Sequence, residues 1–169
     1  NLQDLMLCLK TLEEARVWKD RLDRVESVLM IGGDLTSLAL AKAILKLGKR
    51  VHFMLDEGAF WPLRRDRKRF DEVGAQLNAK GVHVLAGRRV RGVARVGPDA
   101  CRVWIDGDRL DVGLIGAFFG LRPDIRFLSR SGLAVDRGVL VDECLNTGFD
   151  GIYATGDCAQ IYHPGIRDY

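Results

Sequence analysis

This sequence has few cysteines, few histidines and no long apolar run. Its 169 residues include four cysteines and three histidines, and the cysteines show neither a C-x-x-C pair nor the spacing of a metal site. No apolar run approaches the roughly 20 residues that cross a bilayer, and no charged-then-apolar leader opens the chain. These absences argue against a disulfide framework, a metal centre and a membrane protein, and we expect reduced thiols in a cytoplasmic protein.

Charge of one sign is not in large excess either. The formal net charge is +3, which is too small to imply a nucleic-acid partner by itself. A basic run, Arg64–Arg69 ("RRDRKR"), lacks interleaved aromatic residues and has no nucleic-acid-reading motif beside it. Two interpretations of this run remain, a solvated helix start and a docking surface for an acidic protein.

The apolar pattern predicts alternating helices and strands. Thr11 with Glu14 three residues later is a capping-box pattern, and the apolar stripe after it is typical of an amphipathic helix. Short continuous apolar runs are typical of strands buried on both faces, and they lie at residues 26–33, 51–55 and 82–85. Because amphipathic helices lie between them, this order predicts a parallel sheet with right-handed crossovers.

The apolar period changes after Arg89. Two segments, "RVRGVARV" and "CRVWIDGDRLDV", alternate apolar and polar residues around Asp106-Gly107, a dipeptide typical of a tight hairpin turn. We therefore expect an antiparallel ribbon before the next buried strand, which ends at Gly120. Beyond Gly120, short strands alternate with turns. The predicted fold class is α/β, a Rossmann-like doubly wound parallel sheet with an inserted antiparallel β-ribbon and a partial second domain.

The stretch "VLMIGGDLTSLALAKAIL" has the spacing of a dinucleotide-binding turn, G-x-G-x-x-G, after the first strand. In that turn the first glycine allows the bend, the second lets backbone amides approach the pyrophosphate, and the third lets helix and strand pack closely. This chain has Gly32 at the first position, followed by Gly33, but Asp34 at the second and Ser37 at the third. The predicted nucleotide site is therefore degenerate.

Asp34 has two interpretations. A carboxylate at about 4 Å from a phosphate, at an effective dielectric of about 20, is repelled by about 4 kcal/mol before screening. An aspartate just before a helix is also a good N-cap, and it accepts from the amides that a pyrophosphate would otherwise take. Either Asp34 acts as a built-in anion, or the turn is rearranged and still admits a nucleotide.

An acidic residue about 20 positions after the turn binds the adenosine ribose in this fold. Asp56 and Glu57, just behind the second strand, are the candidates here, with a solvated turn as the alternative. These acids favour NAD over NADP, although Arg64 and Arg65 are suited to a 2'-phosphate.

Four segments, in this order, resemble the FAD-dependent pyridine nucleotide-disulfide oxidoreductases, particularly their NADH oxidase, nitrite reductase and rubredoxin reductase-like branch. The segments are "MIGGDLTSLALAKAILKLGKRV", "FWPLRRDRKRFDEVGAQLNAKGVHVLAG", "GAFFGLRPDIRFL" and "GLAVDRGVLVDECLNTGFDGIYATGDCAQ". The resemblance implies a linker helix from the FAD domain at 1–24, an NAD(P)-binding Rossmann-like domain at 25–120, and a truncated C-terminal segment of the FAD domain at 121–169.

The resemblance also implies cofactors and site residues. Gly156 and Asp157 correspond to the pair that ends a strand at the flavin, where the aspartate hydrogen-bonds the ribityl chain, and Gly120 opens the return to the flavin domain. It implies FAD in the complete parent chain and NAD(P)H as its reductant, with NAD favoured. A flavin-binding segment is expected before Asn1 and a dimerisation domain after Tyr169, so the parent is expected to be a homodimer and the isolated chain inactive.

Two functions follow from this resemblance and its departures. The family's active enzymes carry a third glycine and, two residues further, a glutamate near the nicotinamide, where this chain has Ser37 and Ala39. The first function is the nicotinamide-binding part of a FAD-dependent NAD(P)H oxidoreductase, which passes electrons to a redox protein or small acceptor and needs no catalytic residue from this chain. The alternative is a non-catalytic scaffold or docking module for a partner such as ferredoxin, with a decayed nicotinamide site.

Overall fold

The computed structural model describes residues 5–55, 67–162 and 165. The chain divides into two compact units, Asn1–Gly120 and Leu121–Tyr169. The roles predicted for these regions, including a linker helix at 1–24, stay predictions.

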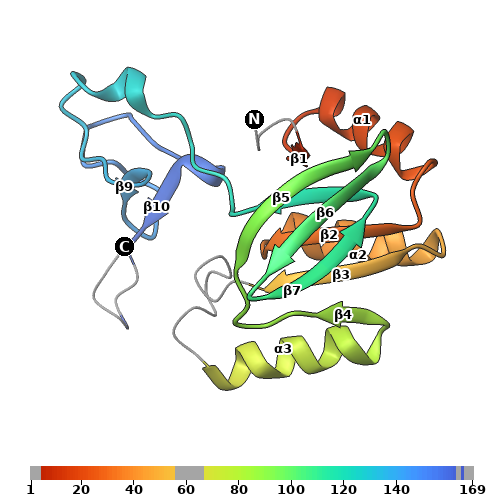
Figure 1. Ribbon diagram of the computed structural model, residues 1–169. Coiled ribbons are helices and arrows are strands. Elements are labelled where there is room, and N and C mark those ends of the chain that lie inside the picture. The colour runs from red at the N-terminus through yellow and green to blue at the C-terminus, as the bar shows by residue number, and fades with distance from the viewer. Residues whose placement is uncertain (1–4, 56–66, 163–164, 166–169) are drawn as a thin grey trace. The chain divides into compact units, whose positions relative to one another are not determined.

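The first unit is built on a five-stranded parallel sheet (Figure 1). Its strands are β1 (Met6–Leu7), β2 (Ser27–Gly32), β3 (Arg50–Leu55), β4 (Val82–Val84) and β8 (Leu114–Phe118). The spatial order is β1-β8-β2-β3-β4, so β8, the last of these strands in the chain, lies between β1 and β2. The predicted α/β class with a parallel sheet is confirmed, whereas the two-residue strand β1 was not predicted.

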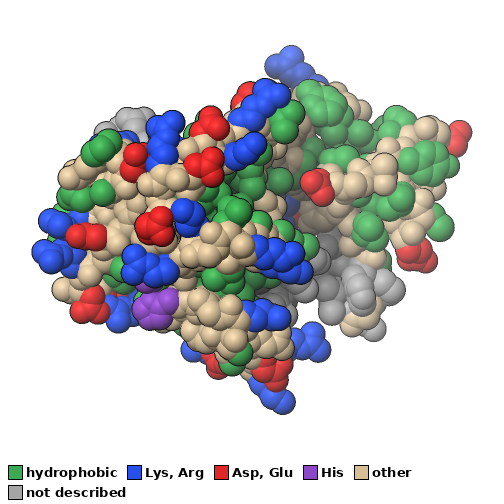
Figure 2. All heavy atoms as spheres, turned by 90° about the vertical axis from the view of Figure 1, so that its right-hand side faces the viewer, with side chains coloured by type: hydrophobic (Ala, Val, Ile, Leu, Met, Phe, Trp, Pro, Cys, Tyr) green, Lys and Arg blue, Asp and Glu red, His purple; other side chains and the backbone are tan. Residues whose placement is uncertain are grey.

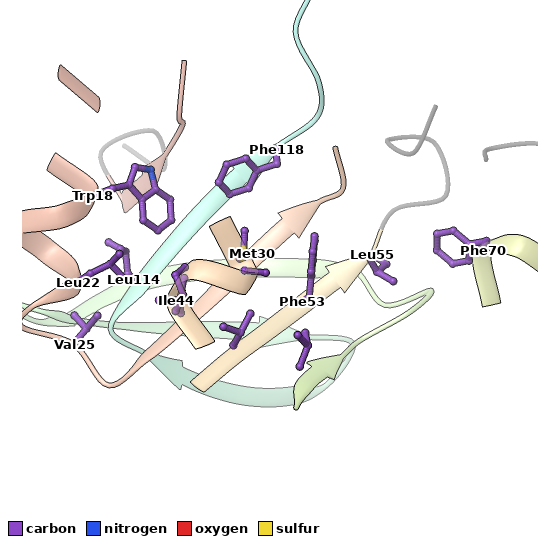
Figure 3. Close-up of a cluster of buried hydrophobic side chains, with 14 residues drawn as sticks. Trp18, Leu22, Val25, Met30, Ile44, Phe53, Leu55, Phe70, Leu114 and Phe118 are labelled. Carbon is purple, nitrogen blue, oxygen red and sulfur yellow. The ribbon is translucent and has the colours of Figure 1, made fainter. Parts of the chain in front are cut away.

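Helices cover one face of this sheet. They are α1 (Leu12–Leu22), α2 (Leu35–Lys46) and α3 (Arg67–Ala79). Their buried side chains pack on alternate residues of β2 and β3, as Figure 3 shows for Trp18, Ile44, Met30 and Phe53. Thr11 and Glu14 form the predicted capping box, with the Thr11 hydroxyl accepting from the Glu14 amide at 3.2 Å.

An antiparallel ribbon covers the other face. It consists of β5 (Val90–Gly97), β6 (Ala100–Ile105) and β7 (Asp108–Val112). Leu29 and Ile31, which alternate with the helix-facing residues of β2, pack in a cluster with Val103 of the ribbon. Since β2 is covered on both sides, its continuous apolar run is explained. The ribbon thus lies on the face where a doubly wound sheet usually carries further helices.

The β6–β7 turn contains the predicted Asp106-Gly107 pair. Both residues have positive φ, 45° and 92°, as a tight hairpin turn requires. The Asp106 carboxylate accepts from the Arg89 amide at 2.8 Å and from the Arg91 guanidinium at 2.9 Å, and these contacts lower the pKa of Asp106. The hairpin prediction is confirmed, and the arginines fix the turn from the neighbouring strand.

The second unit has little regular structure. It contains the parallel pair β9 (Val139–Val141) and β10 (Ala159–Ile161), and the 3-10 turns η3 (Arg126–Leu128) and η4 (Gly156–Cys158). Its small core includes Val139, Val141 and Ala154. This agrees with the predicted short strands without a long helix. Among the described residues of the chain, no helix combines the length and apolar character that a bilayer crossing requires.

Two histidines that are distant in the sequence meet in the first unit. His52 on β3 and His83 on β4 are paired in register, and their Nδ1 atoms lie 3.0 Å apart. One ring must therefore donate and the other accept. Burial of His52 and the charges of His83 and Arg50 lower the pKa of His52. Figure 2 shows histidine side chains at the surface beside Lys and Arg side chains.

This pair makes stability depend on pH. The folded state holds His52 with a pKa below its ordinary value of 6.5, so the unfolded chain binds the proton more readily. Stability is therefore expected to fall as the pH drops through about 6.5. In His52→Gln, the loss of urea midpoint between pH 7.5 and 5.5 should be smaller than in the wild type. Equal losses in the two proteins would show that His52 is not the source.

Candidate functional site

The glycine turn lies at the carboxyl edge of the sheet, where β2 ends. Gly32 has φ +109° and Gly33 has φ +152°. A Cβ on Gly32 would lie 2.0 Å from the Phe118 carbonyl oxygen, and the Gly33 amide donates to that same oxygen at 2.8 Å. The first glycine of the fingerprint is therefore required by the packing of β2 against β8, whether or not a nucleotide binds.

Asp34 is the N-cap of α2. Its backbone is extended, with φ −128° and ψ 177°, and its Oδ1 accepts from the Ser37 amide at 2.7 Å. The capping geometry predicted for this aspartate is confirmed. The consequence of the cap for nucleotide binding stays a prediction.

Ser37 completes a reciprocal capping box. Its Oγ accepts from the Asp34 amide at 2.8 Å and donates to the Asp34 carbonyl oxygen at 2.6 Å, and its side chain is fully buried. The sequence pattern placed Ser37 only at the third position of the fingerprint, in place of a glycine. The signal was its place three residues after an N-cap, where a capping box carries its second polar side chain.

Several backbone amides of the turn already have hydrogen-bond partners within the protein. A phosphate at a helix N-terminus needs free amides and empty space. The amides of Gly33, Asp34 and Ser37 are already donated within the protein, and a carboxylate oxygen takes the place of an anion at Ser37. Leu35, the first residue of α2, is 82% exposed and leaves this helix end otherwise open.

The remaining predicted nucleotide ligands lie outside the described residues, after the end of β3. Leu55 ends β3 in register with Gly32 and is buried in the helix-side core. Asp56, Glu57, Arg64 and Arg65 lie outside the described residues. The predicted ribose contact and the preference for NAD therefore stay predictions.

The residues that the resemblance places on the flavin side, Gly120, Gly156 and Asp157, have open space around them. Gly120, at the end of the first unit, has φ +82°, and Gly156 in the second has φ +70°, with no atom within 4 Å of a Cβ at either position. Thr155 is the N-cap of η4 and makes no side-chain cap hydrogen bond. Asp157 is exposed, and its carboxylate contacts no hydrogen-bond or ion-pair partner in the described part of the chain.

These features fit a polyol ligand at Gly156-Asp157. A carboxylate that is not used within the protein can accept hydrogen bonds from hydroxyl groups, and a glycine allows close backbone approach. Asp157 itself is not the N-cap of η4.

The Gln160 side chain on β10 binds residues 136–138, just before β9. The sequence did not indicate this role. The Oε1 of Gln160 accepts from the Arg137 and Gly138 amides at 3.1 and 3.0 Å, and its Nε2 donates to Asp136 at 3.0 Å. A Cβ on Gly138 would lie 2.7 Å from the Cys158 carbonyl oxygen, so the two segments approach closely. No local pattern signals this role, because the partners are more than 20 residues apart.

Metal chemistry has no support among the described residues. They contain no group of three or more His, Cys, Asp or Glu side chains that could hold a metal ion. His52 and His83 lie inside apolar strand patterns, which favour core histidines over metal ligands. In the structure the two rings touch each other, and His83 is exposed. His163 lies outside the described residues.

The basic run is only partly described. Arg67, Lys68 and Arg69 are exposed at the start of α3, and Arg67 pairs with Asp71 at 3.2 Å. This arrangement agrees with a solvated helix start. A docking role stays a prediction.

The strand order β4-β3-β2-β8 and the glycine turn between β2 and α2 define a protein with a Rossmann-like nucleotide-domain fold. The family model of the pyridine nucleotide-disulphide oxidoreductases matches residues 2–168. The chain belongs to this family, which confirms the resemblance seen in the sequence.

Similar curated proteins and similar solved structures agree with this family assignment. The nitric oxide reductase FlRd-NAD(+) reductase of Citrobacter koseri is 32% identical over 160 residues, which are 94% of this chain and 42% of that protein. A ferredoxin reductase from Rhodopseudomonas palustris is similar with a TM-score of 0.74 and 25% identity, over 96% of this chain and 40% of that one. The covalent putidaredoxin reductase-putidaredoxin complex contains a chain similar with a TM-score of 0.73 and 28% identity, over 95% and 39%. The chain thus spans about two fifths of the length of these proteins.

Proposed function

We propose that the chain is the nicotinamide-side region, with a flanking flavin-domain segment, of a FAD-dependent NAD(P)H oxidoreductase. The observation that carries the proposal is the family match across residues 2–168 on a Rossmann-like sheet. In its parent, FAD supplies the redox chemistry, and the protein supplies position and electrostatics.

The proposed roles of this chain's residues are in binding. Asp157 accepts hydrogen bonds from the flavin polyol, and Gly156 lets the backbone come close. Gly120 marks the passage between the two units. Asp56 and Glu57 bind the adenosine ribose, and Gly32 and Gly33 shape the turn before Asp34. No residue of the chain acts as a catalytic acid or base.

The proposed electron acceptor is a small redox protein. Two of the similar solved proteins are a ferredoxin reductase and a putidaredoxin reductase caught with putidaredoxin, and the curated relatives are named FlRd-NAD(+) reductases. These names support a protein acceptor for the parent of this chain.

The test is anaerobic reduction of flavin in the complete parent chain. The expected result is a yellow protein whose visible flavin absorbance bleaches on addition of NADH. The Asp157→Ala variant should lose flavin content, because it removes the proposed polyol ligand, whereas Asp150→Ala, an exposed aspartate of the same unit, should retain it. A parent that holds no flavin would contradict the proposal.

A second function, a scaffold with a decayed nicotinamide site, is favoured by the capping of the turn. The Asp34 carboxylate occupies the place of an anion in the described structure. In this case the parent would hold flavin that NADH does not bleach at millimolar concentration. Chemical reduction by dithionite would still bleach it, which separates this outcome from a damaged flavin site.

A further inference from the structure

We infer that Asp34 and Ser37 act together as an affinity-determining pair, occupying the phosphate position of the turn and weakening dinucleotide binding. The inference rests on the proposed function, because it concerns the same turn. It differs from a simple loss of glycines, since the two replacements satisfy each other's polar atoms.

The geometry shows how the pair closes the turn. Two amides that point out of an uncapped helix start, those of residues 34 and 37, are instead donated to the partner side chain at 2.8 and 2.7 Å. The Ser37 hydroxyl also donates to the Asp34 carbonyl oxygen at 2.6 Å, so all its hydrogen-bonding groups are used although it is fully buried. The amides of residues 34 and 37 are therefore not free to bind a phosphate.

The negative charge of Asp34 weakens phosphate binding, as does the space that its side chain occupies. The Asp34 carboxylate stands where a pyrophosphate would bring further negative charge, and repulsion at such distances is large enough to reduce affinity at least tenfold. The start of the turn is held against β8, because Gly32 pairs with Phe118 and the Gly33 amide donates to the Phe118 carbonyl oxygen. The nucleotide must therefore displace the Asp34 side chain from the Ser37 amide.

The pair predicts unequal effects of the two single substitutions. In Ser37→Gly, the Asp34 carboxylate and its charge remain at the turn. In Asp34→Gly, the charge is gone, but the Ser37 hydroxyl can still accept from the amide of residue 34. Only the double variant frees both amides and removes the charge, so it should bind dinucleotide most tightly.

The chain contains its own control for helix capping. Thr11 and Glu14 form the same reciprocal box at the start of α1, where Cys8, Leu9 and Lys10 rather than a glycine turn follow the strand β1. Replacing both with glycine removes two capping side chains from a helix, as the double variant at α2 does. A general loosening of the protein would therefore appear in both double variants.

The experiment is a titration of this chain with NADH, followed by nicotinamide fluorescence and by calorimetry. The wild type should bind with a dissociation constant weaker than about 10 μM. Asp34→Gly should bind at least about tenfold more tightly, the Asp34→Gly/Ser37→Gly variant more tightly still, and Ser37→Gly like the wild type. The Thr11→Gly/Glu14→Gly variant should also bind like the wild type.

Folding is checked by circular dichroism and urea unfolding of each variant. If the double variant does not fold, Asp34→Ser keeps an uncharged N-cap and should still bind more tightly than the wild type. Wild-type binding tighter than about 10 μM would overturn the inference. So would a folded Asp34→Gly or Asp34→Ser variant that binds no more tightly than the wild type.

The flavin experiment judges the proposed function separately. A parent chain that holds flavin but is bleached by the same NADH concentration in the wild type and in Asp34→Gly/Ser37→Gly overturns only the inference. A parent without flavin, beside a chain whose affinity rises in the double variant, overturns the proposed function and leaves the role of the pair intact.

Discussion

Gly32→Ala is expected to destabilise the first unit by at least about 4 kcal/mol, among the largest effects of a single substitution. The new Cβ would lie 2.0 Å from the Phe118 carbonyl oxygen, and the backbone has φ +109°, which side chains rarely adopt. Relief requires β2 and β8 to separate at their carboxyl ends. Urea unfolding followed by far-ultraviolet circular dichroism measures the loss.

Gly48→Ala is the matched control for backbone conformation. Gly48 follows α2 with φ +74°, and a Cβ there would meet nothing within 4 Å. The cost is therefore the conformational strain alone, about 1–2 kcal/mol. Similar losses for the two variants would mean that the Phe118 contact does not constrain Gly32.

Trp18→Ala is expected to cost about 3–5 kcal/mol, because it empties a large site in the helix-side core. The side chain is 2% exposed, its Nε1 donates to the Cys8 carbonyl oxygen at 2.9 Å, and its ring centroid lies 6.0 Å from that of Phe118. Figure 3 shows the two rings near one another between α1 and β8. The loss of urea midpoint, again by circular dichroism, is the measurement.

Trp104→Ala provides the comparison for Trp18. Trp104 is 40% exposed on the ribbon, so its removal should cost about 1 kcal/mol. Gly116→Ala tests the same site from β8, since its Cβ would lie 2.7 Å from the Trp18 ring and 2.6 Å from the Phe118 ring, which Trp18→Ala leaves room to move. In the Trp18→Ala background, this added Cβ should be less harmful than in the wild type, and equal costs would contradict close packing at this point.

Much of the fold was predicted from local sequence patterns, because a capping box or a tight turn depends on only a few neighbouring residues. The Thr11–Glu14 box and the Asp106-Gly107 turn both carry their geometry in their own residue types. The strand β1 has two residues, too few to show a period. The contact of His52 with His83 depends on the register of β3 with β4, which no local pattern fixes.

The candidate site was predicted less completely. The position of the turn and the cap at Asp34 followed from spacing and helix chemistry. The bond from Ser37 back to Asp34 depends on a side-chain rotamer, and the demand of Phe118 on Gly32 depends on strands separated by more than 80 residues in the sequence. Such distant packing decides whether a fingerprint residue serves a ligand or the protein itself.

The contact of Gly32 with Phe118 bears on how nucleotide fingerprints are read in genomes. If architecture alone demands the leading glycine, natural selection for a stable protein retains it after cofactor recognition has vanished. A motif scan that rewards this position will then report dehydrogenases among proteins that no longer use pyridine coenzymes. Giving more weight to the second and third glycine positions would distinguish functional nucleotide sites from turns that are kept for stability alone.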